Sequence, residues 1–173
     1  DEHRIGAATR ISRESPVPVI EQSGHVFLPG GAANLAFNVR ALGADVSVAG
    51  LVGDDQMADR LRAILESAGV HTAGLVTEPD RPTSAKLRIW AGGNRQHQHQ
   101  QVARIDTVNR DPVSETSQQE LILYLDHAVP RYHGIVVSDY ENGVVDKPIL
   151  DMLLPLARKS EKFISADSHG QLD

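Results

Sequence analysis

The stretch Pro29-Gly30-Gly31-Ala32-Ala33-Asn34-Leu35-Ala36 joins an apolar, β-branched segment to an alanine-rich helical pattern. Its two glycines allow a tight turn and a close approach of a ligand to the main chain, because neither carries a Cβ. The helix that follows directs unpaired N–H groups and the positive end of its dipole toward this turn. Asn34 adds amide donors and an acceptor. The stretch therefore suits hydroxyl groups or a small anion. The alternative is a plain strand–turn–helix junction, since glycine pairs are common in turns.

Strand-like and helical patterns alternate after this stretch. We expect helices from Asn34 to Gly43, from Gly53 to Gly69, over 114–129 and over 146–156, and strands over 46–52, 70–76, 134–139 and 163–167. This alternation predicts an α/β fold with a parallel sheet covered by helices on both faces. Asp139 and Asp167 end two of these strands, at the sheet edge where open α/β sheets bind ligands.

The remaining segments are more polar. Residues 1–15 mix polar and apolar side chains, and we predict no strand there. Residues 17–20 are predicted to form an edge strand, where Pro18 is tolerated. A turn at Gly24 then leads to a further predicted strand over 25–28. Residues 83–90 and 96–106 alternate about a turn at 91–94, which predicts a polar hairpin. His97 and His99 share a face of that hairpin, but no third metal ligand is evident, so a polar face is favoured over a metal site.

Composition limits the classes of function. The 173 residues, with 40% apolar side chains, suffice for one globular domain. A net charge of −6 argues against a nucleic-acid partner bound by charge. The chain has no cysteine, no apolar run of the ~20 residues that a membrane span needs, and no signal peptide at its start. We therefore expect a cytoplasmic protein with no membrane partner. Walker A, dinucleotide-binding and nucleophile-elbow motifs are absent from the sequence.

The glycine stretch gains specificity from its spacing. This region resembles the N-terminal signature of the ribokinase (PfkB) family of carbohydrate kinases. The pattern is Gly30-Gly31-Ala32-x-Asn34-x-Ala36, followed after six residues by Gly43 and after nine more by Gly53. The flanks resemble the heptose-phosphate kinases, the kinase half of the bifunctional enzyme that makes ADP-heptose for lipopolysaccharide. The segments that carry this second resemblance are 9–19, Pro82-Thr83 with 86–88, 104–106, and 138–140 with Gly143.

The resemblance implies a ribokinase-like, three-layer α/β/α fold with a parallel central sheet and a small β lid built from residues of about 10–28 and 83–106. It implies phosphoryl transfer from ATP, with Mg²⁺, to a hydroxyl of a sugar or sugar phosphate, and a heptose 7-phosphate in particular. A kinase for a different sugar stays open. Exposed edges of lid strands often pair between subunits, so we expect a homodimer through the lid.

The same resemblance assigns site residues. Asp1, Gly30, Gly31 and Asn34 would hold sugar hydroxyls; Lys86, Arg88 and Arg104 would hold a substrate phosphate, which ammonium and guanidinium groups suit; Asp139 would contact substrate; and Asp167 would line the nucleotide side or a metal–water network. Each has a simpler alternative: a frayed terminus for Asp1, a solvent-facing lid for the cations, and structural roles for the two later aspartates.

Family members place their catalytic base in a Gly-Ala-Gly-Asp type segment and link an Asn-x-x-Glu segment to Mg²⁺, and neither occurs in these 173 residues. The family's first strand is also missing. Ser168-His169-Gly170 stands where the heptose branch often has Pro-Lys-Gly. We therefore assign no catalytic residue and no metal ligand, and expect a single incomplete kinase domain over 1–173, from a larger enzyme or a truncated relative. The alternative is a catalytically silent sugar-binding or scaffold domain that dimerises through its lid.

The sequence predicts that these 173 residues alone do not transfer a phosphoryl group, because the segment that supplies the base and the anion hole is absent from them. An assay with ATP, Mg²⁺ and a sugar phosphate is expected to show no turnover above a protein-free control. Robust turnover by the isolated chain would contradict this expectation.

Overall fold

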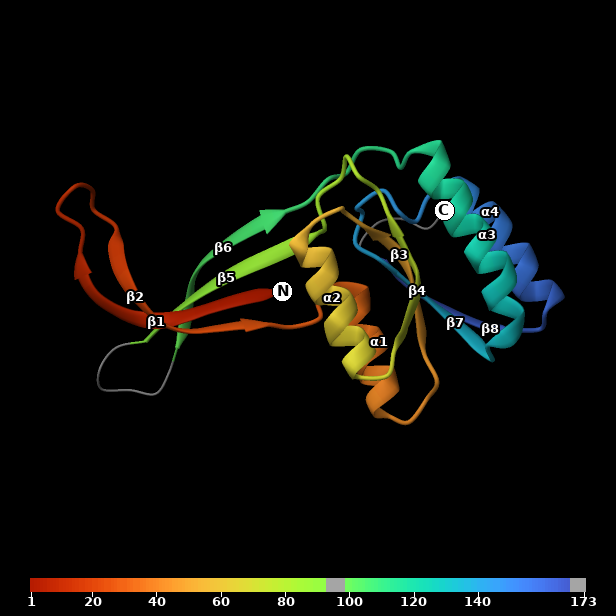
Figure 1. Ribbon diagram of the computed structural model, residues 1–173, viewed down its shortest axis with the longest axis horizontal. Coiled ribbons are helices and arrows are strands. Elements are labelled where there is room, and N and C mark those ends of the chain that lie inside the picture. Colours follow the sequence, from red (N-terminus) through yellow and green to blue (C-terminus); the bar gives the residue numbers. More distant parts are fainter. Residues whose placement is uncertain (93–98, 169–173) are drawn as a thin grey trace.

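A four-stranded sheet stands apart from an α/β body in the computed structural model, which describes residues 1–92 and 99–168 (Figure 1). The sheet contains β1 (Glu2–Ile11), β2 (Pro18–Phe27), β5 (Ala85–Gly92) and β6 (Gln100–Thr107) in the order β2-β1-β5-β6. β1 is parallel to β5, and the other two pairs are antiparallel. The lid-like sheet that the sequence predicts over 10–28 and 83–106 thus also includes residues 2–9.

The N-terminal strands differ from the sequence-based assignment. Residues 2–11, which received no strand, form the inner strand β1 because their backbone pairs with β2 on one side and β5 on the other. β2 is one continuous strand, since Gly24 lies opposite Ile5 at a register shift and makes no turn. The edge position of the strand that contains Pro18 is confirmed. The turn residues Gly93 and Asn94 lie outside the described residues, as does His97.

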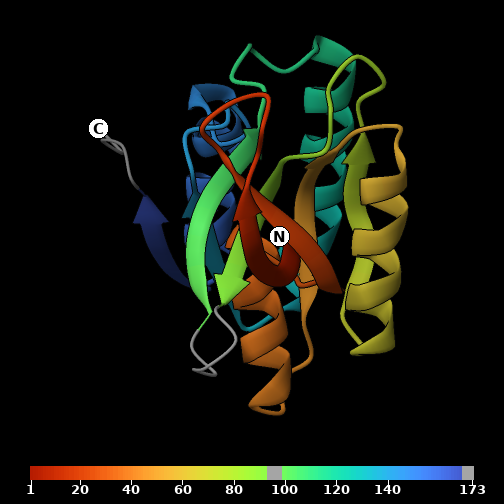
Figure 2. The same cartoon turned by 90° about the vertical axis from the view of Figure 1, so that its left-hand side faces the viewer.

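The body has the predicted α/β alternation. Its strands are β3 (Ser47–Val52), β4 (His71–Thr77), β7 (Gly134–Asp139) and β8 (Phe163–Ser168), and its helices are α1 (Gly31–Ala41), α2 (Gln56–Ser67), α3 (Glu115–Ala128) and α4 (Lys147–Lys159), with a 3-10 turn, η1 (Val129–Arg131). Helices α1 and α2 lie on one side of β3 and β4, and α3 and α4 lie on the other (Figures 1 and 2). The predicted three-layer α/β/α class is confirmed.

The parallel central sheet is present in two pieces. β3 pairs in parallel with β4, and β7 pairs in parallel with β8. Among the described residues, no strand hydrogen-bonds β3 to β7. The expected continuous sheet is therefore interrupted between these two strands.

Local sequence signals set the helix ends. The carboxylates of Asp55 and Asp146 accept hydrogen bonds from Ala58 N (2.9 Å) and Ile149 N (3.1 Å), which caps α2 and α4. Gly43 follows α1 with φ = 95°, a backbone conformation that glycine adopts without strain. The predicted helix ends agree with the observed ones to within three residues. None of the described helices is both long and apolar enough to cross a membrane.

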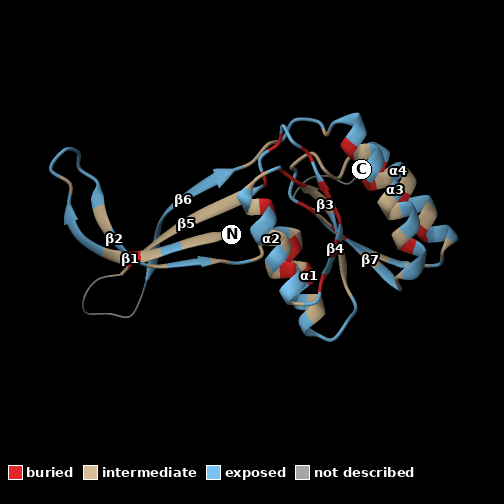
Figure 3. Ribbon diagram, viewed as in Figure 1, coloured by how far each residue is buried: buried red, intermediate tan, exposed pale blue. Residues whose placement is uncertain are grey.

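Buried side chains concentrate in the body (Figure 3). Leu65, Val52 and Val70 are the largest fully buried side chains, and they pack between α2 and the β3–β4 pair. In contrast, every residue of β6 is exposed. The four-stranded sheet therefore has little core of its own, and its position depends on the segments that join it to the body.

Arg81 holds those joining segments together. Its side chain is 6% exposed. Nη1 donates to the carbonyl oxygens of Asn109 and Asn142 (both 3.0 Å), and Nη2 donates to that of Asp111 (2.6 Å). One guanidinium thus connects the chain entering β5, the chain leaving β6 and the loop after β7.

Thr83 makes a second connection at the base of the sheet. Its hydroxyl accepts from Gly53 N (2.9 Å), and its own N–H donates to Asp55 Oδ2 (2.8 Å). Burial alone would raise the pKa of Asp55, but the hydrogen bonds from the Thr83 and Ala58 amides outweigh it and lower the pKa. The N-terminus of α2 is therefore fixed to the start of β5.

Replacing Arg81 with Met is expected to lower the free energy of unfolding by about 3 kcal/mol, because three carbonyl oxygens lose a charged donor in a buried place. Urea denaturation measures this change. Arg10→Met, at an exposed position of β1, is the matched control and should change stability by less than about 0.5 kcal/mol. A loss for Arg81→Met no larger than that of the control would show that the three contacts contribute little.

Candidate functional site

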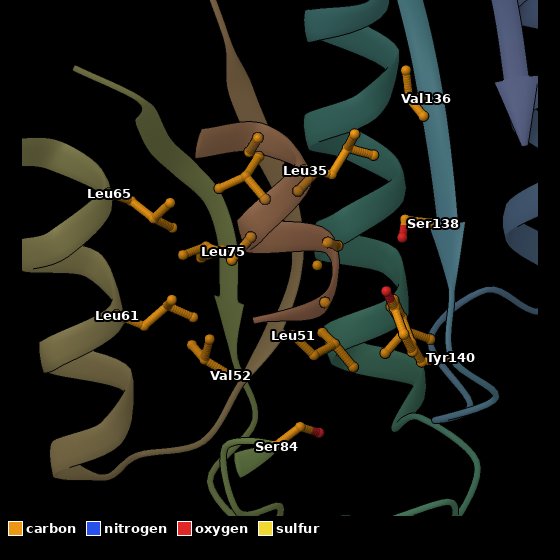
Figure 4. Close-up of a pocket in the computed structure, with 18 of the residues that line it drawn as sticks. Leu35, Leu51, Val52, Leu61, Leu65, Leu75, Ser84, Val136, Ser138 and Tyr140 are labelled. Carbon is orange, nitrogen blue, oxygen red and sulfur yellow. The ribbon is translucent and has the colours of Figure 1, made fainter. Parts of the chain in front are cut away.

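A cavity of about 480 Å³ lies between β3 and β7, and its rim is formed where these strands end (Figure 4). The interior is lined by apolar side chains such as Leu35, Leu51, Leu75 and Val136. Polar and glycine residues gather at the rim: Asp1, Gly30, Gly31, Ser84, Lys86, Ser138, Asp139 and Tyr140. The rim joins the body to the four-stranded sheet.

The predicted glycine turn lies at this rim. A Cβ at Gly30 would come within 2.7 Å of Asp1 Oδ1, so glycine allows the Asp1 carboxylate to lie against the main chain. Gly31 has φ = 53°, which disfavours other residues, and a Cβ there would lie 3.4 Å from the Tyr140 ring. No side chain of the described residues caps the first turn of α1. Its N-terminal N–H groups therefore face the rim without a built-in acceptor side chain.

Three predicted cations share one face of the four-stranded sheet. Lys86 and Arg88 alternate along β5, and Arg104 of β6 lies opposite Arg88 in the ladder. Asp106 lies opposite Lys86 on the same face. The strand alternation that the sequence predicts over 83–90 is confirmed and puts Lys86 and Arg88 on one face, and the register adds Arg104 to that face.

Carboxylates partly neutralise these cations. Asp106 accepts from Lys86 Nζ (3.0 Å) and pairs with Arg104 Nε (2.9 Å), while Arg88 Nε lies 3.4 Å from Asp1 Oδ2. The hydrogen bond from Lys86, reinforced by the charge of Arg104, lowers the pKa of Asp106, so it stays ionised. Three cations face two carboxylates, and the face keeps an excess of positive charge. Partly exposed ion pairs of this kind are weak, so an incoming anion can displace the carboxylate.

The other predicted site residues either have hydrogen-bond partners within the protein or lie outside the cavity lining. Asp139 is buried at the rim, but its Oδ1 accepts from Glu141 N (2.9 Å) and its Oδ2 from the Ser168 hydroxyl (3.0 Å). Asn34 is exposed on the first turn of α1 and does not line the cavity. Asp167 is exposed on β8, also away from the cavity lining. Its role on a nucleotide side stays a prediction.

Two rim residues were not predicted. Tyr140 packs beside Gly31, and Ser84 lies opposite it across the mouth of the cavity in Figure 4. Tyr140 directly follows β7, whereas Ser84 directly precedes β5 of the separate four-stranded sheet. No signal in the sequence brings these two positions together.

The described residues fit an anionic or hydroxylated ligand better than a metal. Among them, no group of three or more His, Asp or Glu side chains could hold a cation.

Comparisons of the sequence with protein families and with curated proteins agree on one kind of protein. Residues 4–131 match the family described as pfkB family carbohydrate kinase. The Bifunctional protein HldE of Gluconobacter oxydans is 39% identical over 160 residues, covering 92% of this chain and 32% of that protein. The Bifunctional protein HldE of Geobacter sulfurreducens is 36% identical over 170 residues, covering 98% of this chain and 34% of its own length. The chain thus spans about a third of the length of these curated relatives.

Solved structures show the same fold. The phosphofructokinase-2 of Escherichia coli in complex with fructose-6-phosphate superposes with a TM-score of 0.67 at 19% identity, over 98% of this chain and 52% of that chain. Ribokinase of Arabidopsis thaliana, complexed with ribose and ATP, superposes with a TM-score of 0.62 at 16% identity, over 99% of this chain and 51% of that chain. At these identities the likeness concerns the fold.

Proposed function

The chain belongs to the pfkB family of carbohydrate kinases, and on that premise we propose that it forms the acceptor side of a kinase that phosphorylates a hydroxyl of a sugar phosphate. The observation that carries the proposal is the junction of two surfaces at one rim. The glycine turn with Asp1 supplies polar main-chain and carboxylate groups, and the face with Lys86 and Arg88 supplies positive charge.

Each surface suits a different part of such a ligand. Asp1 can accept hydrogen bonds from sugar hydroxyls, and the first N–H groups of α1 can donate to them. The excess positive charge of Lys86, Arg88 and Arg104 suits a phosphate monoester, which carries nearly two negative charges at neutral pH. In the structure Asp106 pairs with two of these cations, Lys86 and Arg104. We propose that the substrate phosphate takes its place.

A heptose 7-phosphate is the substrate that we propose. The HldE proteins match nearly the whole chain at 36–39% identity, and the segments around Lys86 and Arg104 resemble the heptose-phosphate kinases. ATP with Mg²⁺ is the proposed phosphoryl donor, by analogy with the family. This proposal assigns to the described residues the binding and orientation of the acceptor only.

Isothermal titration calorimetry with D-glycero-D-manno-heptose 7-phosphate tests the proposal. Lys86→Ala and Arg88→Ala should each weaken binding by at least about tenfold, since a charge-assisted hydrogen bond contributes about 1.5–3 kcal/mol. Asn34→Ala tests whether the side-chain amide of Asn34 binds a sugar hydroxyl, which would be seen as weaker binding of the heptose phosphate. Arg10→Ala removes an exposed cation elsewhere on the same sheet and should leave the affinity unchanged. The proposal fails if the unmodified chain does not bind, and the site assignment fails if the cation variants bind as well as Arg10→Ala.

The ligand series separates the acceptor classes. Fructose 6-phosphate that binds as tightly as the heptose phosphate would favour a kinase for a different sugar. If heptose without its phosphate binds with the same affinity as heptose 7-phosphate, the cationic face does not bind the phosphate. Sugar binding together with a complete absence of kinase activity in the full gene product would favour the catalytically silent alternative.

We also propose that two copies associate through the four-stranded sheet. The face opposite the cations carries Leu87, Ile89 and Ile105, and Ile105 is 56% exposed. Apolar area of this kind is typical of a contact surface. Sedimentation velocity should show a dimer that Ile105→Asp converts to monomer, while Leu123→Asp on α3, at a residue 62% exposed, leaves it intact. A monomeric unmodified chain at micromolar concentration would contradict the proposal.

A further inference from the structure

A row of three basic side chains crosses the cationic face of the four-stranded sheet. The register places His3 of β1 opposite Arg88 of β5, and Arg88 opposite Arg104 of β6. Residues that lie opposite each other in a ladder point to the same face, so His3 belongs to the face that carries Lys86, Arg88 and Arg104. Neighbouring strands lie about 4.8 Å apart, which puts His3 and Arg104 about 10 Å apart, one on each side of Arg88. A phosphate group over Arg88 therefore lies within reach of all three side chains.

The ring of His3 has an aromatic neighbour but no polar partner. It is half-buried, and within the described part of the chain its nitrogens make no hydrogen bond or ion pair. The ring packs on the indole of Trp90, with centroids 5.7 Å apart and planes tilted by 38°. Trp90 lies two residues beyond Arg88 on β5, and its Nε1 is itself buried without a hydrogen-bond partner. The indole can therefore orient the imidazole while both imidazole nitrogens remain available to a ligand.

The surroundings of His3 favour its neutral form. Burial lowers the pKa of the His3 ring, and the Arg88 guanidinium and the amino group of Asp1 lower it further. Val26 of β2, which lies opposite His3 on its other side, is uncharged. The charged side chains that face His3 come from its own segment and from β5 and β6: Asp1, Lys86, Arg88, Arg104 and Asp106. With His3 neutral, these side chains carry one excess positive charge.

A bound phosphate reverses that balance. A phosphate monoester carries nearly two negative charges at neutral pH, so its arrival leaves the face with about one excess negative charge. An opposite charge within about 4–6 Å favours the protonated form of an imidazole. One proton on His3 then restores neutrality. An acceptor with a single negative charge, such as a sugar carboxylate, would neutralise the face without that proton.

On the basis of the proposed function, we infer that His3 is a further contact of the substrate phosphate and takes up a proton from solvent when the phosphate binds. The acceptor is then a phosphate monoester in its dianionic form, held between His3, Arg88 and Arg104. No covalent bond of the substrate forms or breaks in this step. Trp90 is a positioning residue, because it acts through the ring of His3.

Isothermal titration calorimetry in two buffers of different ionisation enthalpy measures the proton uptake. D-glycero-D-manno-heptose 7-phosphate is titrated into the 173-residue chain at pH 7.5, where a free monoester with a second pKa of about 6 is already a dianion. The chain should take up at least about 0.3 proton per ligand bound. Because protonation and binding are coupled, the affinity should rise about threefold or more as the pH falls from about 8.5 to about 6.5.

His3→Phe separates proton uptake from packing. It keeps a ring that can pack on Trp90, but this ring cannot take up a proton. The variant should bind about fivefold more weakly at pH 6.5 and should lose the uptake measured at pH 7.5.

His25→Phe is the matched control. His25 also packs on an aromatic ring, that of Phe27, with centroids 4.5 Å apart. It lies opposite Arg4 and therefore on the other face of the same sheet, so both measured values should stay unchanged. The amino group of Asp1, whose pKa is lowered by burial, is present in every variant, so its own proton uptake cancels in the comparison.

Four results would overturn the inference, and three of them leave the proposed function standing. Binding of the heptose phosphate with no more proton uptake than in His3→Phe would show that His3 stays neutral. Equal affinities of His3→Phe and the unmodified chain at pH 6.5 would show that His3 only packs on Trp90. An equal loss of uptake in His25→Phe would place the proton elsewhere. If neither heptose 7-phosphate nor fructose 6-phosphate binds the unmodified chain, this inference and the proposed function both fail.

Discussion

The buried guanidinium of Arg81 is the interaction on which the arrangement of the two parts depends. It is bonded to three carbonyl oxygens that belong to the exit from β6 and to the loop after β7. The four-stranded sheet buries few side chains, so apolar burial alone cannot orient it. A charged donor held out of water must keep its partners, and this requirement fixes the base of the sheet against the body.

The site follows from that fixed base. The cationic face belongs to the four-stranded sheet, and the glycine turn belongs to the body, so neither forms a ligand site without the other. Thr83 stands two residues before β5, the strand that carries Lys86, and its hydrogen bonds connect the start of this strand to Asp55 and Gly53. Asp1 and Lys86 lie at one rim because β1 pairs in parallel with β5, with Glu2 opposite Leu87. The hydrogen bonds at the base then hold that sheet against the glycine turn of the body.

Much of the fold was predictable because its signals are local. Helix caps at Asp55 and Asp146, the glycine after α1, and the apolar runs of β3 and β7 each depend on a few neighbouring residues. β1 was missed because its residues are mixed in character and its strand conformation comes from pairing with β2 and β5. Of the predicted site residues, the shared face of Lys86 and Arg88 follows from strand alternation. Tyr140 and Ser84 required knowledge of which loops meet.

The sequence by itself determined the family, the α/β alternation and the glycine turn, because spacing and periodicity are properties of the chain alone. Only the tertiary structure decided three further features. It placed Arg104 and Asp106 on the face of Lys86 and Arg88, because register is set by pairing between distant strands. It engaged both oxygens of Asp139 in internal hydrogen bonds. And it separated β3 from β7, since the pairing of a sheet depends on every strand that is available to fill it.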